Sequence, residues 1–558
     1  MPRFAPWLAG WRPYALLVAL CLGLYLPGIA AIPVLDRDEA RFAQATRQML
    51  ETGDFIDIRF QDEARNQKPA GIYWLQAAAV HALSDPASTA IWPYRLPSLV
   101  GAGLAVLLTF GFGRALLRGD GESEDAAPAA ALLAAVLLAT ALGVVAEAHI
   151  AKTDACLLAA ITCGQGALGL AYVRSRAARP VGAGVVAAFW AAQIAAILLK
   201  GPLGPVLALL TAATVSVADR DARWLRALRP VAGSLAAVLV VGPWLYAIER
   251  ATEGRFLSAS VGHDLVWKLL GAQESHGAPP FYYVALALLT FWPGSLFLAP
   301  TLIRAWRSHE RPAARFLLAW IVPAWVCLEM VPTKLPHYVL PLYPALALLA
   351  ATAVTAGAAD EEGGWLRWAK PAAAALWLGV TLLIAGALIV LPLRFGEGLS
   401  AAGIAGAVML VALAVALLRR RPAPLATAGM IAALALTLVV PAGFWVMPAL
   451  DRLWLSRGAA AMVAASPPVG RTPLVVLGYN EPSLVFLLGG RLQIGVMPGA
   501  VTALTGGGEA LVSGREDAQF QQGLAARGLA ASAVDSIRGT DYSNGQRMVL
   551  TLYKIAPK

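Results

Sequence analysis

Residues Tyr14–Val34 read YALLVALCLGLYLPGIAAIPV, and Leu35–Ala43 continue with LDRDEARFA. The first segment matches the about 20 apolar residues that a transmembrane helix needs. It follows Arg3 and Arg12, is long for a signal peptide and lacks a small-residue cleavage pattern, so we expect an uncleaved signal anchor. The second segment gathers acids and arginines where the span ends. Charge beside lipid is costly, so such a cluster indicates function.

The composition of the chain indicates a polytopic membrane protein. Of its 558 residues, 58% are hydrophobic and only 14% are charged, whereas a soluble domain has about 25% charged residues. The net charge of +10 would suggest nucleic acid in a soluble protein. Here the basic residues fall in short loops between apolar runs, which is a topology signal, so we expect no nucleic-acid partner. The four cysteines lie in apolar segments and predict packing rather than metal binding.

The apolar runs predict about thirteen spans. Their starts lie near Pro13, Ile91, Ala127, Asp154, Val181, Pro205, Pro230, Pro280, Ala314, Val339, Pro371, Ala401 and Leu425. Alternate loops are strongly basic, as in Arg220–Arg229 and Arg419–Arg421, which predicts that they face the cytoplasm. The other loops are longer, mixed in charge and rich in His, Tyr and Pro. Any chemistry is therefore expected at the outer end of the spans.

Two segments of the first outer loop predict helices that lie along the membrane surface. After Asp38, the residues Phe42, Ala45 and Met49 recur at helical spacing. The apolar run Gly71–Leu83 is too short to cross a bilayer. We expect both helices to be interfacial.

The chain changes character after about Pro448. Residues Leu474–Leu477 and Met548–Leu552 predict strands, and Gln519–Ala531 predict a helix. The predicted fold class is thus a mainly α polytopic membrane protein with a small C-terminal α/β domain. We expect a membrane domain over residues 1–448, with the interfacial helices within 35–83, and an outer α/β domain over 449–558.

Two acidic positions at predicted span mouths could carry chemistry. Adjacent Asp38 and Glu39 could act as a base, bind an amine or hydroxyl group, or hold a divalent cation. Asp154, within the run Lys152–Asp154, falls at the same predicted level. Either aspartate could instead simply cap a helix.

Three basic or proline-rich segments lie at the same predicted mouth. Lys68 and Lys200 each precede a Pro or Gly-Pro, and a lysine beside lipid favours an anionic partner such as phosphate, although snorkelling to the interface would explain it too. The prolines of Thr333–Pro344 would break a helix and line a cavity, where Lys334, His337 and Tyr338 could contact a headgroup. A structural kink is the alternative reading.

A loop containing His263 has further histidines and acids that could ligate a divalent metal. Its spacing matches no standard zinc pattern. The sequence identifies no definite cofactor. A divalent metal ion bound by His263 is the one candidate that this loop offers.

Acids, lysines and arginines beside lipid suit a substrate with a lipid tail and a phosphate. A transporter would more often place charge at the bilayer midplane on broken helices, and charge within the predicted spans is scarce. The residues themselves leave a lipid-modifying enzyme and a polyprenyl-lipid transporter as the alternatives.

Five strings occur in a characteristic order. They are DRDEARFAQATRQMLETGDF (36–55), QKPAGIYW (67–74), KTDA (152–155), LLKGPLGP (198–205) and TKLPHYVLPLYPALA (333–347). With them the chain resembles the bacterial type C (GT-C) glycosyltransferases of the protein O-mannosyltransferase superfamily. Within this group it is most similar to the lipid A aminoarabinose transferases, over nearly the whole chain.

The resemblance implies an inner-membrane pentosyltransferase, with its site and α/β domain facing the periplasm. Such enzymes move 4-amino-4-deoxy-L-arabinose from undecaprenyl phosphate to lipid A phosphates with inversion, a lipopolysaccharide modification that gives polymyxin resistance. It implies that Asp38 and Asp154 are the catalytic acids and that Lys68 and Lys200 engage the carrier phosphate. The further substrate-binding or carrier-phosphate-binding positions that we expect are Arg41, Lys334, His337 and Tyr338.

One departure concerns Gln67, where related sequences often have Glu, so any role of that carboxylate is in doubt here. Hexosyl and O-mannosyl transferases share much of the pattern, and a lipid-linked sugar transferase acting on protein or glycan is the alternative enzyme. We expect the protein to act as a monomer.

Overall fold

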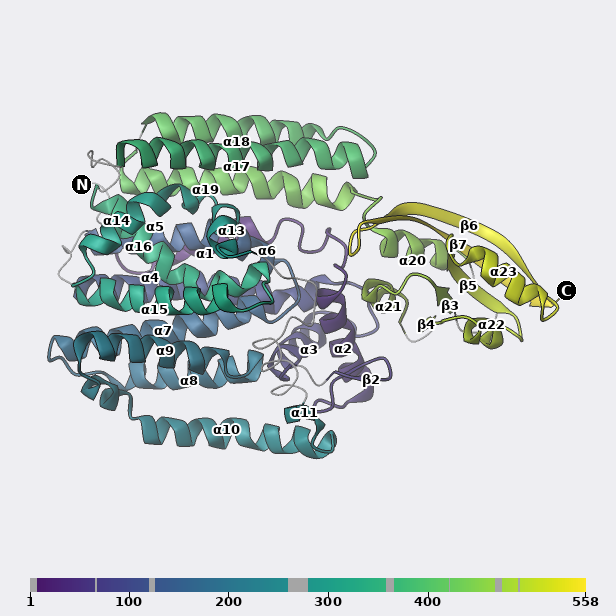
Figure 1. Cartoon of the computed structure of the whole chain (residues 1–558), viewed down its shortest axis with the longest axis horizontal. Coiled ribbons are helices and arrows are strands. Elements are labelled where there is room, and N and C mark those ends of the chain that lie inside the picture. The colour runs from purple at the N-terminus through teal and green to yellow at the C-terminus, as the bar shows by residue number, and fades with distance from the viewer. Residues whose placement is uncertain are drawn as a thin grey trace.

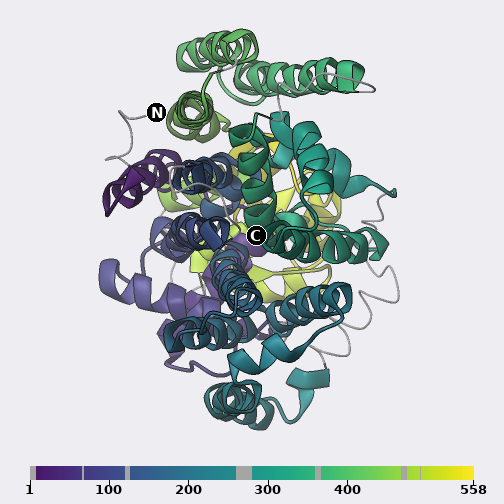
Figure 2. The same cartoon turned by 90° about the vertical axis from the view of Figure 1, so that its left-hand side faces the viewer.

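The computed structural model describes residues 8–65, 68–119, 126–258, 279–357, 366–420, 422–466, 474–489 and 492–557. A bundle of helices is joined to a smaller sheet region at one end (Figure 1). Viewed along the bundle, many helices are seen nearly end-on, so they run roughly along the same axis (Figure 2). This is the layout that a set of membrane spans requires.

Nine helical segments of the described ranges are long and apolar enough to cross a membrane. They are α4 (Trp92–Gly119), α7 (Asp154–Arg176), α8 (Ala183–Lys200), α10 (Pro230–Ala251), α15 (Pro312–Met330), η5 (Pro336–Leu342) with α16 (Tyr343–Thr355), α17 (Leu366–Phe395), α18 (Ala401–Arg420) and α19 (Pro424–Pro441). Helix α5 (Ala126–Thr140) and helix α6 (Leu142–Ala148) form a pair bent by 60°, which would be a tenth span.

A helix begins within a few residues of every predicted span start. Fewer of the described helices than predicted, however, are both long enough and apolar enough to cross a membrane. Helices α1 (Arg12–Tyr25) and α9 (Leu203–Asp219) are shorter than the other candidates. Helices α13 (Tyr282–Thr290) and α14 (Leu298–Arg307) are separated by a turn at Pro293. Proline has no N–H to donate to a helix, which favours a break there.

Helix α7 lies at the centre of the bundle, with most of its residues buried. A Cβ added at Gly101 of α4 would lie only 2.8 Å from the Cα of Cys156, so a glycine is needed for the close approach of the two helices. The far end of α7 is held by Asp219, which accepts a hydrogen bond from Tyr172 at 2.6 Å and pairs with Arg315. At about 1.5 Å per residue, this helix separates its two ends by about 35 Å.

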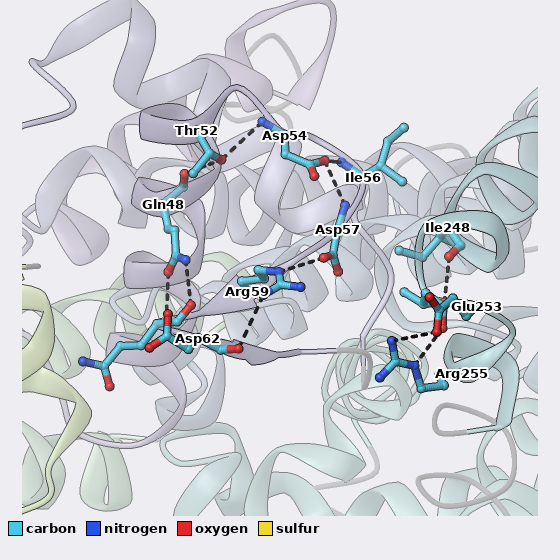
Figure 3. A network of polar contacts seen from close by, with 12 residues as sticks. Gln48, Thr52, Asp54, Ile56, Asp57, Arg59, Asp62, Ile248, Glu253 and Arg255 are labelled. Atoms are coloured by element: carbon cyan, nitrogen blue, oxygen red, sulfur yellow. Dashed lines mark hydrogen bonds and ion pairs between the residues drawn. The ribbon is translucent and has the colours of Figure 1, made fainter. Parts of the chain in front are cut away.

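The two predicted surface helices are present as α2 (Asp38–Thr52) and α3 (Gly71–Leu83). Between them in the chain lies a short hairpin of β1 (Arg59–Phe60) and β2 (Glu63–Ala64). Figure 3 shows part of the network that holds this connection, in which Asp54 accepts backbone hydrogen bonds from Ile56 and Asp57. The side-chain amide of Gln48 donates to the carbonyl oxygen of Gln61 and accepts from its backbone N–H. These contacts fix the backbone path from the end of α2 to the hairpin.

The C-terminal region contains a five-stranded sheet of strand order β4-β3-β5-β7-β6. Its strands are β3 (Leu474–Leu477), β4 (Leu492–Ile494), β5 (Gly508–Ser513), β6 (Leu529–Asp541) and β7 (Gln546–Pro557). Strand β3 is parallel to β4 and β5, whereas β7 is antiparallel to β5 and β6. Helices cover it as α20 (Leu455–Ala465), α21 (Pro482–Leu488), α22 (Gly499–Ala503) and α23 (Asp517–Ala525), with an apolar core on either side.

The fold class is confirmed as a mainly α membrane protein with a C-terminal α/β region, and both predicted strands are present. The predicted helix over Gln519–Ala531 is wrong at its end. Helix α23 stops at Ala525, and Leu529 begins β6. Gly528, with φ of 70°, provides the left-handed turn between them.

Candidate active site

Side chains from three separate segments meet around the carboxylate of Asp154, the first residue of α7. Lys200 Nζ, at the end of α8, donates to Oδ1 at 2.5 Å, and Lys152 Nζ lies 3.6 Å from Oδ2. His337 Nε2, in η5, lies 3.8 Å from Oδ1. No side chain of the four is more than 16% exposed. Buried charges of both signs therefore compensate one another in a small volume.

Lys152 links this cluster to a second carboxylate. Its Nζ lies 2.9 Å from Oε1 of Glu147, in α6, and 3.4 Å from Nδ1 of His337. An ammonium can only donate, so Nδ1 accepts and the imidazole proton sits on Nε2, facing Asp154. Burial lowers the pKa of Lys152, but the carboxylates of Glu147, Asp154 and Asp38 more than offset this and raise it above its ordinary value. Lys152 is therefore a permanent cation.

Asp38, the first residue of α2, is exposed and lies close enough to act on this cluster electrostatically. Its charge contributes to the raised pKa of Lys152. Burial raises the pKa of Tyr73, in α3; Arg65 lowers it, and Asp38 raises it further. Arg65 Nε donates to the Tyr73 hydroxyl at 2.9 Å. The exposed carboxylate of Asp38 therefore acts on groups of both α3 and the segment that precedes α7.

The neighbouring acid, Glu39, is buried, whereas Asp38 is exposed. Its two carboxylate oxygens accept hydrogen bonds at 2.8 Å from Nε and Nη2 of Arg95, and both side chains are completely buried. Backbone N–H groups of Leu35 and Ala151 also donate to it at 2.8 Å. Arg95 in turn donates to the carbonyl oxygens of Ile29, Ile32 and Pro33. Glu39 is therefore a positioning residue that joins the first outer loop to the segment carrying Lys152.

The sequence did not single out Arg95 or assign Glu39 a separate role. The available signal was an arginine inside the apolar helix that begins at Trp92, because such a residue needs a buried anionic partner. Choosing Glu39 over Asp38 required the direction of each side chain, which depends on where α2 begins.

The other sequence-predicted positions are spread around the cluster. Lys200 Nζ lies 5.6 Å from the ring centroid of Tyr338, and the charge of Lys68 acts on His337. Arg41 is exposed and its charge acts on Glu481 of the C-terminal region. Lys334 is buried, with its Nζ 3.9 Å from Glu329 and 3.3 Å from the carbonyl oxygen of Pro279. These contacts place Lys334 with Glu329 rather than among the partners of Asp154.

His263, the predicted metal ligand, lies outside the described residues. Within the described ranges, no group of three or more His, Cys, Asp or Glu residues is arranged to hold a metal ion.

The C-terminal hairpin touches the first outer loop just before Asp38. The backbone N–H of Asp36 donates to the hydroxyl of Tyr542 at 2.6 Å, and Arg37 Nη2 donates to the carbonyl oxygen of Ser543 at 2.7 Å. Burial raises the pKa of Asp36 from its ordinary 3.8 to about 7; hydrogen bonding from Ser483 opposes this rise and the charge of Glu481 adds to it.

This contact is expected to weaken as pH rises. The folded pKa of Asp36 is raised, so its stabilisation is complete below pH 3.8 and is lost as pH rises to about 7. We expect hydrogen exchange at the β6–β7 turn to be faster at about pH 8 than at about pH 5, after correction for the intrinsic rate. Asp36→Asn should remove this difference, whereas Asp535→Asn, exposed on β6, should keep it. An unchanged pH response in Asp36→Asn would contradict the assignment.

Comparison with known proteins shows that the chain is similar in sequence to a group of arabinosyl transferases. No protein-family model matches the chain. It is 25% identical over 394 residues to the undecaprenyl phosphate-α-4-amino-4-deoxy-L-arabinose arabinosyl transferase of Pseudomonas savastanoi, covering 67% of each chain. It is 28% identical to the corresponding transferases of Pseudomonas fluorescens and Pseudomonas paraeruginosa, over 61% and 64% of this chain and 59% and 61% of theirs.

Solved structures agree in fold over nearly the full length. The crystal structure of ArnT from Cupriavidus metallidurans bound to undecaprenyl phosphate superposes with a TM-score of 0.72, at 19% identity, and covers 97% of this chain and 98% of that one. The apo form of the same protein gives a TM-score of 0.69 over 96% of this chain. The resemblance inferred from the motifs is confirmed: in sequence the chain is similar to proteins named as aminoarabinose transferases, and it shares the fold of the Cupriavidus metallidurans protein.

Proposed function

We propose that the protein is an integral membrane glycosyltransferase that moves 4-amino-4-deoxy-L-arabinose from undecaprenyl phosphate to a phosphate group of lipid A. The observation that carries the proposal is the buried cluster of Asp154, Lys200, Lys152 and His337 beside Asp38. It lies in a fold shared with a protein crystallised with undecaprenyl phosphate. The named activity of the sequence relatives supports the choice of sugar.

The charges of the cluster match those of this donor. An aminosugar linked to a polyprenyl phosphate carries an ammonium on the sugar and one negative charge on the phosphodiester. Lysines 68, 152 and 200 supply cations, and Asp38 and Asp154 supply carboxylates. We propose that Lys200 leaves Asp154 to bind the phosphate, which frees the Asp154 carboxylate for the sugar ammonium. A neutral hexose would leave that carboxylate with Lys152 alone, at 3.6 Å, in place of two cations.

The proposed reaction is a single displacement. A phosphate oxygen of the acceptor attacks the anomeric carbon as the bond from that carbon to the carrier phosphate oxygen breaks, and the configuration inverts. Lys200 and Lys68 stabilise the negative charge that gathers on the departing phosphate. The acceptor phosphate is already ionised near neutral pH, so the attack requires no strong base. The aspartates then serve to hold the sugar rather than to remove a proton.

The distribution of charge supports a periplasmic site in the inner membrane. The end of α7 opposite to Asp154 carries Arg174 and Arg176, and Arg315 lies beside it at Asp219. Basic loops favour the cytoplasmic side. We infer that the Asp154 cluster and the C-terminal region face the periplasm, where the lipid A headgroup would be modified and polymyxin resistance conferred.

Transfer by the purified full-length chain in detergent tests the proposal. The donor would be undecaprenyl phosphate-aminoarabinose and the acceptor lipid A, with the product analysed by mass spectrometry. We expect lipid A to gain the mass of aminoarabinose. A product formed only from hexose donors would support the alternative transferase. Movement of the donor across vesicles without any transfer in detergent would support a transporter.

Replacement of Asp38 by asparagine should lower kcat/KM in this assay by about 10- to 100-fold, the equivalent of one charge-assisted hydrogen bond to the substrate. The midpoint of thermal unfolding should change little, because Asp38 is exposed. Asp535→Asn, which removes an exposed acid distant in sequence, is the matched control. Near-full transfer by a folded Asp38→Asn protein would remove this residue from the site.

A further inference from the structure

A second, strongly basic cleft lies where the bundle meets the C-terminal sheet. Its volume is about 860 Å³, and its lining contains five arginines and no acidic residue. The arginines are Arg394 at the end of α17, Arg452 in the turn before α20, Arg515 after β5, Arg538 on β6 and Arg547 on β7. Apolar side chains, among them Phe395 and Val549, complete the walls.

None of these arginines forms an ion pair with an acidic side chain in the described part of the chain. Arg515 donates to the neutral side chain of Gln546 at 2.5 Å, and Arg452 lies 3.5 Å from the carbonyl oxygen of Arg394. The side chains of Arg538 and Arg547 make no hydrogen bond or ion pair to any described residue. Other exposed arginines of the chain do find acids, as Arg457 does with Asp451. Like charges gathered without a partner indicate an anionic ligand.

The strand register places two of the arginines on one face of the hairpin. Arg538 is paired with Val549, and Arg547 with Thr540, so Arg538 and Arg547 are diagonal neighbours across β6 and β7. At that spacing of about 7–8 Å, two long side chains can reach one ligand. Guanidinium groups bind phosphate oxygens in pairs, with a geometry that lysine lacks.

Backbone contacts build the cleft before any ligand binds. The N–H of Arg452 donates to the carbonyl oxygen of Phe395 at 2.9 Å, and its carbonyl oxygen accepts from Thr540 N–H at 2.7 Å. A Cβ at Gly539 would lie 2.6 Å from that same carbonyl oxygen, so glycine permits the contact. The end of α17 and the β6–β7 hairpin are thereby held at a fixed separation.

The position of the cleft points to a lipid headgroup. Arg394 is in the last turn of α17, one of the apolar helices long enough to cross a membrane, and basic residues at such an end lie at headgroup level. Tyr542 also lines the cleft, and its hydroxyl accepts a hydrogen bond from Asp36, two residues before Asp38. One wall of the cleft is therefore continuous with the loop of the candidate active site.

We propose that this arginine cleft binds the phosphorylated headgroup of the acceptor, a glycolipid carrying more than one phosphate. The inference rests on the proposed function for the identity of the acceptor. The cleft holds an acceptor phosphate, whereas the Asp154 cluster holds the sugar donor. Removal of the cleft arginines is accordingly expected to weaken binding of the acceptor and to leave binding of the donor unchanged.

The test compares the full-length protein with Arg538→Gln/Arg547→Gln in detergent. We expect the Kd for diphosphorylated lipid A and the KM for this acceptor to rise by at least about tenfold. The KM for the undecaprenyl-linked donor should stay within about twofold. Arg223→Gln/Arg527→Gln removes the same charge from exposed positions outside the cleft and should leave all three constants unchanged. Arg538→Lys/Arg547→Lys should recover part of the binding.

Competing anions identify the source of the phosphate. Dephosphorylated lipid A should bind weakly, and inorganic phosphate should compete only poorly with the diphosphorylated form. Equal competition by phosphatidylglycerol micelles, or an unchanged acceptor KM in an active Arg538→Gln/Arg547→Gln enzyme, would overturn the inference and leave the proposed function intact. Arginine-dependent binding by a protein that transfers no aminoarabinose would instead contradict the proposed function.

Discussion

Replacement of Asp154 by asparagine is expected to lower kcat/KM for sugar transfer by about 100- to 1,000-fold. This is the range found when a group that stabilises the charge of a transition state is removed. The carboxylate is the shared partner of Lys200 and Lys152. Without it, Lys200 loses the partner that holds it at the end of α8, and the sugar ammonium loses its proposed acceptor. Initial rates with purified protein would measure the effect.

A second variant separates a chemical role of Asp154 from a structural one. Asp154→Asn alone leaves Lys200 without its carboxylate partner and Lys152 with Glu147 only, which is expected to destabilise the fold by up to about 3–5 kcal/mol. Asp154→Asn/Lys200→Gln removes one charge of each sign and should recover much of the lost thermal stability without recovering activity. Recovery of both would show that Asp154 acts only through folding, and near-normal transfer by Asp154→Asn alone would exclude it from the site.

Replacement of Arg95 by leucine is expected to have the largest effect on stability, a loss of about 3–5 kcal/mol, because it leaves the Glu39 carboxylate buried and uncompensated. All three guanidinium nitrogens of Arg95 donate hydrogen bonds, to Glu39 and to the carbonyl oxygens of Ile29, Ile32 and Pro33. Arg95→Lys should fail as well, since an ammonium cannot reproduce this planar set of donors. The apparent midpoint of thermal unfolding in detergent would report both losses.

Arg114→Leu provides the control on the same helix. Arg114 stacks at 5.6 Å over the ring of Phe110 and is only partly buried, so its loss should cost little. Equal midpoints for Arg95→Leu and the wild-type chain would contradict the assigned role. Because the Glu39 contacts also hold Ala151, next to Lys152, transfer by Arg95→Leu should fall even at temperatures where the protein stays folded.

Much of the architecture follows from local composition. Apolar runs set the helix positions, and the loss of such runs after Pro448 predicted the C-terminal α/β region. The chemistry of Asp154 was also accessible, since a carboxylate and lysines at the mouths of different spans had reason to meet. Pairing Lys200 with Asp154, and Lys334 with Glu329, required the tilt and depth of each helix, which sequence periodicity does not contain.

The arginine cleft was beyond prediction for a different reason. Its five arginines are spread along the sequence from Arg394 to Arg547. Each one alone resembles an ordinary solvated arginine. Only the register of β6 against β7, and the close approach at Gly539, place them around one volume. Similarly, the separate roles of the adjacent acids Asp38 and Glu39 depend on a single helical step at the start of α2.

The hydrogen bonds from Asp36 and Arg37 to Tyr542 and Ser543 define how small a working version of this protein can be. A fragment that ended after α19 would keep every helix long enough to span a bilayer, together with Asp38, Asp154 and Lys200. Its first outer loop, however, would lose both external supports immediately before Asp38. We therefore expect a fragment competent for sugar transfer to include the β6–β7 hairpin, because a truncation before it would remove both contacts that hold the loop next to Asp38.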